Sequence, residues 1–521
     1  MEKIEQKFKE IFNKEDKTIF LITIISSMII HFQLYALMIT GPDTLLNSIY
    51  HQADAWEAML LRFGLDFVQM IKGNIVSPIL STLISSIFLG ISVILVTKIL
   101  NIKNKYIKYV ITILFVVAPN ISATLTFFYC SDAYLLGFLL AITSIYLIKK
   151  YKTQNWMTII SGIILAIAMG MYQTYLSVAM VLAVATLIID ILNKKETKQV
   201  LKNILKYLIV GIIGIILFYV FAYLTLFLKH LQASTYSGAD KIGLSTLLKL
   251  PELLPEAYES FFSYYFNDKI IPNTIWLTNI FYIVIFAVTI FSIIYIVIKN
   301  KIYKNISNTI IGFVLIICLP ICFGIIEIVA PSVDIHILMA CSMILIFPIF
   351  FKIIEILPTA RITAICKYTV IICSIIIAWN YMWQDNASYI SIKIMQNQAE
   401  ATANRFVMQV ELYDGYTPEM PVIITGGLET SQYFNRDNTT LESKKIFDRT
   451  WGFISSNPTM WWGNQESWKK MIYEYIGANL NIVNQSDYPE IIESEEYKQM
   501  GNYPEEESIK IIDNVLVIKI S

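Results

Sequence analysis

Charged residues are scarce in this sequence. Asp, Glu, Lys and Arg make up 15% of its 521 residues, whereas 56% are apolar. A soluble globular chain has about 25% charged residues, so this deficit excludes a disordered chain and an ordinary soluble enzyme. A net charge is also absent, because 40 basic residues balance 40 acidic ones. Nothing in the total charge therefore indicates a nucleic acid as partner.

Further absences narrow the chemistry. The chain has no glycine-rich phosphate loop of the kinds that bind ATP or dinucleotides. None of its six cysteines follows Cys373, so we expect the last part of the chain to fold without disulfides. No cluster of His and Asp has the spacing of metal ligands. The sequence therefore indicates no cofactor, and the participation of a divalent cation stays open.

Long runs without Asp, Glu, Lys or Arg dominate the first three quarters of the chain. A membrane-spanning helix needs about 20 apolar residues, with about 17 as the lower limit. The run 153–189 is too long for one helix and is predicted to bend back at 170–173, which raises the prediction from ten spans to eleven. The ten runs cover residues 18–42, 73–97, 109–131, 133–148, 153–189, 207–228, 270–298, 305–326, 335–351 and 368–384.

Lysine and arginine are distributed unevenly between alternate loops. If the N-terminus is cytosolic, the inner segments carry 23 Lys and Arg and the outer connections carry six. This asymmetry follows the positive-inside rule. Eleven spans then place the C-terminal part outside the cell. The sequence therefore predicts a multi-pass plasma-membrane protein with a cytosolic N-terminus.

The balance of acidic and basic residues changes after the last charge-free run. Residues 1–384 hold 20 acids and 29 bases, but residues 385–521 hold 20 acids and 11 bases. We therefore predict a transmembrane helix bundle over 1–384 and an extracytoplasmic α/β domain over 385–521. Its predicted elements are helices at 388–413 and 465–477 and strands at 421–425, 508–512 and 515–520. Trp451, Trp461, Trp462 and Trp468 are expected in its core, with sugar stacking as the less favoured alternative.

Two outer connections are long. Within 229–269, leucines and aromatics recur at helical spacing over 244–266, which predicts a helix in the membrane interface or, about as readily, a loop packed on the bundle. In 41–72, Asp43 follows Gly-Pro directly after the first span, at the membrane rim. Asp132 lies at the tight outer turn between the third and fourth spans. Asp54 and Glu57 are interpreted as solvated loop charges.

Two carboxylates held at the lipid surface could act as a general base and as a ligand of substrate or metal. A nearby arginine, Arg62, could neutralise a phosphate leaving group. The alternative is that all these charges are simply solvated. His31 is the one acid or base near the midpoint of a predicted span, and a lone histidine in a helix is expected to bond to a neighbouring helix. The lack of other such groups disfavours an ion-coupled carrier but is compatible with a lipid flippase.

Several stretches resemble the Gtr type II family of polytopic, serotype-converting glucosyltransferases. They follow one another in the family's order over nearly the whole chain. At 61 the resemblance predicts a glycine before Arg62, where this chain has Leu61. The stretches are Pro42-Asp43, 56–63 (WEAMLLRF), 128–134 (FYCSDAY), 170–175 (GMYQTY), 236–240 (YSGAD) and the closing 502–521.

The resemblance implies a membrane glycosyltransferase of the GT-C class, whose catalytic acid lies in the first outer loop. It therefore points to Asp43 as the base. Asp132 is expected to position substrate or a metal ion and Arg62 to hold the donor phosphate. The expected lining of the sugar or lipid pocket is Tyr172, Gln173, Tyr236 and Asp240.

The resemblance also implies the substrates: a hexose, expected to be glucose, moves from a polyprenyl-phosphate donor to a cell-envelope polysaccharide. The predicted topology favours the same donor, because nucleotide sugars are cytosolic whereas the polar loops face outward. The expected partners are thus the lipid-linked sugar, the surface polysaccharide and membrane lipids, with no nucleic acid. A polysaccharide or lipid-linked sugar flippase without catalysis is the alternative, and a glycan-binding envelope assembly protein is a third hypothesis.

Overall fold

A computed structural model describes residues 13–39, 50–53, 55–235, 249–266, 276–330, 337–358, 360–427 and 465–521. The chain forms two compact units. The first contains Met1–Phe32 and Tyr50–Asp385, and the second contains Gln33–Ile49 and Asn386–Ser521.

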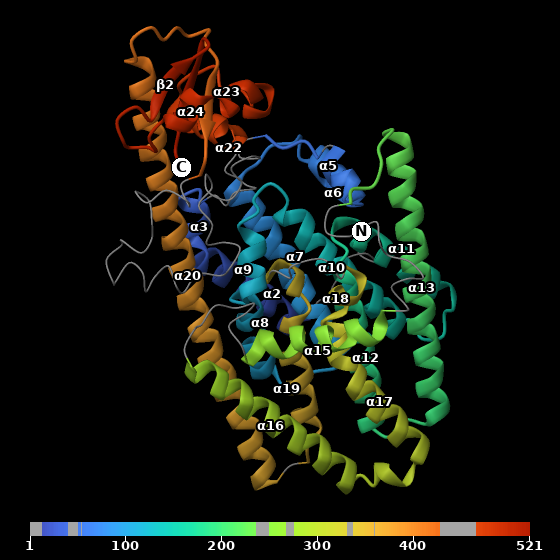
Figure 1. Ribbon diagram of the computed structural model, residues 1–521. Helices are drawn as coiled ribbons and strands as arrows, with labels where there is room; N and C mark the ends of the chain where they lie inside the picture. Colours follow the sequence, from blue (N-terminus) through green and yellow to red (C-terminus); the bar gives the residue numbers. More distant parts are fainter. Residues whose placement is uncertain are drawn as a thin grey trace. The chain divides into compact units, whose positions relative to one another are not determined.

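The regular elements in the described part of the first unit are helices, joined by turns and loops (Figure 1). Its last helix, α20 (Arg361–Glu411), continues into the second unit. The shorter helices up to Asp385 are α2 (Lys14–Ile30), α3 (Phe32–Ala36), α5 (Ala55–Met59), α6 (Phe63–Ile71), α9 (Pro119–Leu125), α18 (Ile325–Val329), η2 (Ile302–Lys304), η3 (Ile337–Ala340) and η4 (Met343–Leu345). The longer ones are α7 (Pro78–Ile99), α8 (Lys105–Val116), α10 (Ser131–Lys150), α11 (Trp156–Met171), α12 (Tyr175–Leu192), α13 (Thr197–Leu228), α15 (Leu250–Phe266), α16 (Trp276–Lys299), α17 (Ile306–Phe323) and α19 (Ile346–Ile356).

Among the described residues, eight helices are long and apolar enough to cross a membrane, or nine if the pair α8–α9 is one span. Three predicted spans fall outside these eight. They correspond to α2, with 17 residues and a charged first turn, to α8–α9, bent by 48°, and to α11, with 16 residues. Length and composition thus support about eight spans, and eleven stays a prediction.

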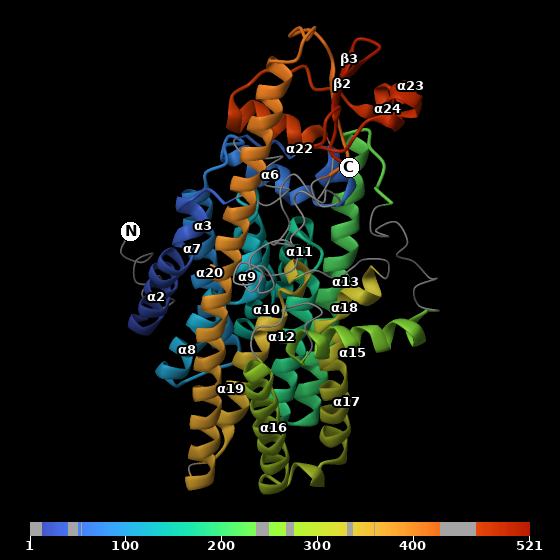
Figure 2. The same cartoon turned by 60° about the vertical axis from the view of Figure 1, so that its left-hand side comes forward.

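The predicted bend inside 153–189 is confirmed. The helix α11 ends at Met171 and α12 begins at Tyr175, so the polar residues between them form the turn. In Figure 2, α10 and α11 lie side by side, and α11 also packs against α13.

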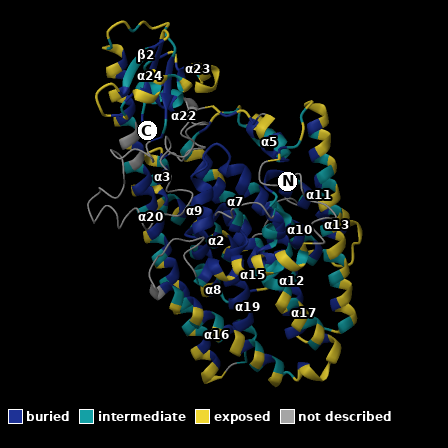
Figure 3. Ribbon diagram, in the orientation of Figure 1, coloured by how far each residue is buried: buried dark blue, intermediate teal, exposed yellow. Residues whose placement is uncertain are grey.

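Burial separates inner from outer helices. In the most apolar stretch of α12, 89% of the residues are buried, whereas the corresponding stretches of α13 and α17 are 22% and 17% buried. Figure 3 shows exposed residues along α13, α16 and α17, and many of these are large apolar side chains such as Leu208, Ile212 and Phe313. Outward-facing apolar side chains on long helices are what contact with lipid requires.

The helices α7 and α10 run in the same direction. Ser85, in the first half of α7, donates to Ser131 at the start of α10 (3.4 Å), and Lys149 donates to the carbonyl of Ile99 at their last turns. At this second end, Lys352 donates to the carbonyl of Asn101 (2.6 Å). These lysines satisfy carbonyls that a helix C-terminus leaves without partners. We call this the lysine end of the bundle, and the end where α7 and α10 begin the site end.

The expected helix in 244–266 is present as α15, described from Leu250. It packs against α17 and α18, with Leu253 and Ala257 in one apolar cluster with Ile328. The segment is thus helical from Leu250 and packs on the bundle, and its position in the membrane interface stays a prediction. Its residues 244–248 lie outside the described residues.

The span predicted at 368–384 and the helix predicted at 388–413 are both helical, and they belong to one helix, because α20 runs unbroken from Arg361 to Glu411. The sequence changes from apolar to mixed near 385, but it contains no Gly or Pro there. A change of polarity alters what a helix packs against, whereas Gly or Pro is needed to weaken its backbone. The boundary between the two units accordingly falls inside a helix.

In the second unit, three strands form a mixed sheet in the order β1-β3-β2. β1 (Val422–Thr425) pairs in parallel with β3 (Val515–Lys519), which pairs antiparallel with β2 (Ile509–Ile512). All three lie where strands were predicted. The helical segments that follow β1 are α22 (Gln465–Lys470), the π-helical turn η8 (Met471–Ile476), η9 (Gln485–Asp487), α23 (Pro489–Glu493) and α24 (Glu495–Gln499).

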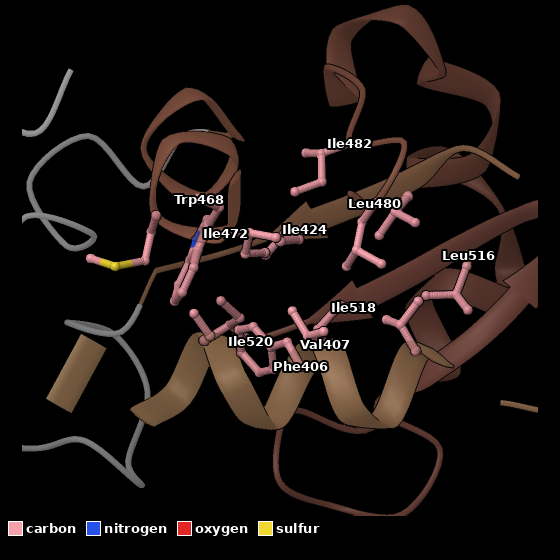
Figure 4. Packing of buried hydrophobic residues seen from close by; sticks show 14 of the residues in the cluster. Phe406, Val407, Ile424, Trp468, Ile472, Leu480, Ile482, Leu516, Ile518 and Ile520 are labelled. Carbon is pink, nitrogen blue, oxygen red and sulfur yellow. The ribbon is translucent and has the colours of Figure 1, made fainter. Parts of the chain in front are cut away.

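Alternate strand residues face two different apolar clusters. Ile424 and Ile518 join Phe406 of α20 and the residues of α22–η8 on one face (Figure 4), while Ile423 and Val517 join α23 on the other. Trp468 is fully buried with its ring centroid 5.2 Å from that of Phe406, so this tryptophan is a core residue as expected. The other three tryptophans of the group lie outside the described residues.

Candidate active site

Four of the seven predicted site residues are described, and all four lie at the site end of the bundle. Asp43, Tyr236 and Asp240 lie outside the described residues. Arg62, Asp132, Tyr172 and Gln173 come from the turn between α5 and α6, the first turn of α10, and the turn between α11 and α12. Three segments far apart in the sequence therefore supply the described part of the site.

Arg62 lies among aromatic side chains. Its Nη1 donates to the hydroxyl of Tyr134 (3.2 Å), and its guanidinium carbon lies 4.6 Å from the ring centroid of Tyr172. The rings of Tyr134 and Tyr172 are themselves stacked, with centroids 5.2 Å apart. Among the described residues no carboxylate pairs with Arg62, and its enclosed Nε has no hydrogen-bond partner. An enclosed cation of this kind is suited to an anionic ligand.

Backbone geometry fixes where Arg62 points. Leu61, which precedes it, has φ +62°, a conformation that glycine adopts without strain and leucine does not. The resemblance predicts glycine at this position, and the structure gives the physical reason. Because Leu61 turns the chain sharply, Arg62 becomes the residue that caps α6.

Close helix contacts hold α6 on α11. The ring of Phe63 lies against Gly170, where any Cβ would collide with it. Gly64 in turn contacts Met171. The side-chain amide of Gln173 donates to the carbonyl of Leu60 (2.6 Å). The turn between α11 and α12 is thus fastened to the turn that carries Arg62, which explains why the stretch 170–175 belongs to the site.

An ion pair that the sequence did not predict lies at the other end of α6 from this arginine. Lys72, the residue after α6, has its Nζ 3.0 Å from Oδ1 of Asp132 and 3.1 Å from Oδ2. The same Nζ donates to the carbonyl of Tyr129 (2.8 Å), and so does the amide of Gln69. Lys72 and Asp132 are 60 residues apart, so no local pattern could have indicated the pair. Tyr134 was within reach of sequence analysis, because it closes the stretch 128–134.

These residues belong to the part of the chain that resembles known proteins. Residues 43–347 match the family of GtrII glucosyl transferases, and this match covers more than half of the 521 residues. The chain belongs to the GtrII glucosyl transferase family. The resemblance seen in the sequence is thereby confirmed, and the protein is a membrane glucosyltransferase. No curated protein and no solved structure matches the chain.

The GtrII match includes every predicted site residue, from Asp43 onward, and ends at the start of α19. It excludes the part of the second unit that begins at Asn386. The family relationship therefore concerns the bundle and its site.

The interpretation of Glu57 as a solvated charge was wrong. Glu57 is only 9% exposed, and its Oε1 lies 3.1 Å from Nε2 of His51. The His51 ring packs edge-on against Tyr129, with centroids 4.6 Å apart. Burial of Glu57 arises because the antiparallel bridge Tyr50–Ile75 brings the chain before α5 next to the residues after α6. Asp54 lies outside the described residues.

Among the described residues, no three His, Cys, Asp or Glu side chains come together as metal ligands. Asp132, which was expected to position substrate or a metal ion, uses its carboxylate for Lys72 and for the backbone N–H of Ala133.

Proposed function

We propose that the protein transfers glucose from a polyprenyl-phosphate donor to a cell-envelope polysaccharide on the outer face of the membrane. The observation that carries this proposal is Arg62. Its guanidinium is held by two stacked tyrosines, and within the described residues it lacks a carboxylate partner. A phosphodiester would supply the missing negative charge.

The distribution of lysine supports the outward orientation. Loops at the lysine end belong to the segments that carry 23 Lys and Arg, whereas the connections at the site end carry six. The positive-inside rule then gives a cytosolic N-terminus and an extracytoplasmic site. Nucleotide sugars are cytosolic, so a donor at this face has to be linked to lipid. By the same argument, residues 1–384 form a plasma-membrane bundle and residues 385–521 an extracytoplasmic domain. The resemblance implies that this bundle is of the GT-C class.

In this mechanism Asp43 takes the proton of the acceptor hydroxyl while the acceptor oxygen attacks the anomeric carbon of glucose. The bond from that carbon to the phosphate oxygen breaks, and the phosphate leaves with the electron pair. Arg62 holds the phosphate, and Asp132 contributes to positioning it. Tyr172, Gln173, Tyr236 and Asp240 line the pocket for the sugar and lipid.

The test is transfer of radiolabelled glucose from polyprenyl-phosphate glucose by the purified full-length protein in liposomes. We expect label in the polysaccharide acceptor and release of polyprenyl phosphate. The donor assignment is refuted if label is transferred only from a nucleotide sugar. Movement of the intact lipid-linked sugar between leaflets, without transfer, would support the flippase hypothesis instead.

A further inference from the structure

The ion pair between Lys72 and Asp132 is asymmetric in its accessibility. The side chain of Lys72 is 19% exposed, whereas that of Asp132 is 5% exposed. Asp132 also accepts a hydrogen bond from the N–H of Ala133 (3.0 Å) and lies in the first turn of α10, where the helix dipole favours a negative charge. A ligand at the site end can therefore reach the ammonium group of Lys72 more easily than the carboxylate behind it.

Lys72 and Arg62 flank the same short helix and turn toward the same segment. Arg62 precedes α6 and contacts Tyr134, and Lys72 follows α6 and contacts Tyr129 and Asp132. The thiol of Cys130 contacts the hydroxyls of Tyr129 and Tyr134 in this segment.

The charge of the phosphate increases during the reaction. A donor phosphodiester carries one negative charge, whereas the released phosphate monoester carries about −1.5 to −2 at neutral pH. The single positive charge of Arg62 balances the single negative charge of the donor. The additional negative charge that develops as the bond to the sugar breaks needs a second cation, and only interactions that strengthen in the transition state raise turnover.

We propose that Lys72 stabilises the phosphate leaving group and that Asp132 holds the Lys72 ammonium in place and offsets its charge until the bond to the sugar breaks. This inference rests on the proposed function and deepens it. Lys72 is a catalytic residue that touches the departing phosphate. Asp132 is a positioning residue that acts through Lys72, rather than a base or a metal ligand. The carbonyl of Tyr129 fixes the ammonium from a third side.

Charge balance predicts how the site discriminates between donor and product. With Asp132 ionised, Lys72 is compensated and the net charge of the three groups is +1, which suits the monoanionic donor. Neutralising Asp132 raises the net charge to +2, which favours the more highly charged product. Neutralising Lys72 lowers the net charge to zero and weakens product binding most.

The experiment measures kcat, the KM for polyprenyl-phosphate glucose and the inhibition constant of polyprenyl phosphate, with the full-length protein in liposomes. For Lys72→Gln we expect kcat to fall about 100-fold, as for loss of one group that stabilises a developing negative charge. Donor KM should change less than about threefold and product inhibition should weaken about tenfold. Lys72→Arg should restore most of kcat. Asp132→Asn should strengthen product inhibition about tenfold.

Asp16 and Lys98 provide a matched control. They form a similar pair, with Oδ2 2.8 Å from Nζ and side chains 3% and 26% exposed. Lys98 lies in the last turn of α7, so this pair is at the lysine end, about 30 Å away along the helices. Asp16→Asn should lower the melting temperature and leave product inhibition unchanged.

The inference is overturned if Lys72→Gln changes donor KM and product inhibition equally, or if Asp132→Asn weakens product inhibition as Lys72→Gln does. If Lys72→Gln does not fold, Lys72→Arg and Asp132→Asn still test the inference. Only a leaving-group role of Lys72 predicts tighter product binding on loss of the Asp132 charge. A wild-type protein that cannot use polyprenyl-phosphate glucose refutes the proposed donor. A wild-type protein that uses it, with the same product inhibition in all variants, refutes only this inference.

Discussion

Replacing Arg62 by methionine should separate ligand binding from stability. Methionine keeps much of the apolar stem but removes the charge that we assign to the donor phosphate. A hydrogen bond to a charged group contributes about 1.5–3 kcal/mol. The dissociation constant for polyprenyl-phosphate glucose should therefore increase by about 10- to 150-fold.

The stability of the protein without donor should hardly change in Arg62→Met. The variant loses the bond to Tyr134, about 1.5–3 kcal/mol, and the stacking on Tyr172, about 2 kcal/mol for a desolvated cation. It also removes an enclosed cation whose Nε has no partner among the described residues, and enclosing such a charge destabilises the fold by several kcal/mol. These contributions nearly cancel.

Lys352→Met is the control, because it removes a cation that does have a carboxylate partner. Lys352 pairs with Glu355 at 3.0 Å, and the two side chains are 7% and 13% exposed. Removal of Lys352 leaves the half-buried carboxylate of Glu355 without its cation and should destabilise the protein by about 3 kcal/mol, with donor binding unchanged. The assays are equilibrium donor binding and thermal unfolding in the same liposomes. Our reasoning is wrong, and Arg62 is a structural residue, if Arg62→Met unfolds at as low a temperature as Lys352→Met and still binds donor normally.

Four further predictions concern other parts of the chain. Asp43→Asn should lower kcat at saturating donor by about 10²–10⁴-fold. Substitution by Asn of the half-buried Asp66, which forms a surface ion pair with Lys229, should have little effect; a tenth or more of the activity in Asp43→Asn would place the base elsewhere. Gly170→Ala should reduce both stability, by about 1–3 kcal/mol, and donor affinity, because Phe63 must move; unchanged donor binding would contradict this. Glu57→Gln should lower the unfolding free energy by about 1–3 kcal/mol, measured by thermal unfolding, and a silent substitution would contradict its burial. A reporter fused after Ser521 should be active only in its extracytoplasmic form, and cytosolic activity would overturn the proposed orientation.

Much of the secondary structure was determined by the sequence itself. The charge-free run 153–189 predicted two helices with a turn at 170–173, and α11 and α12 have that arrangement. The apolar stretches 508–512 and 515–520 predicted two strands, and β2 and β3 confirm them. Asp513 and Asn514 between these strands have the positive φ that a tight turn requires. These features depend on neighbours a few residues apart, and local patterns are enough to predict them.

Tertiary structure alone decided which charges meet and which helices continue. Lys72 and Asp132 pair across 60 residues because α6 packs beside the start of α10. Glu57 is buried because His51 is brought to it by the chain before α5. The helix α20 passes the change of composition near 385 because nothing there breaks its backbone. Such contacts depend on packing between distant segments, and packing decides whether a charged side chain in a loop is solvated or buried.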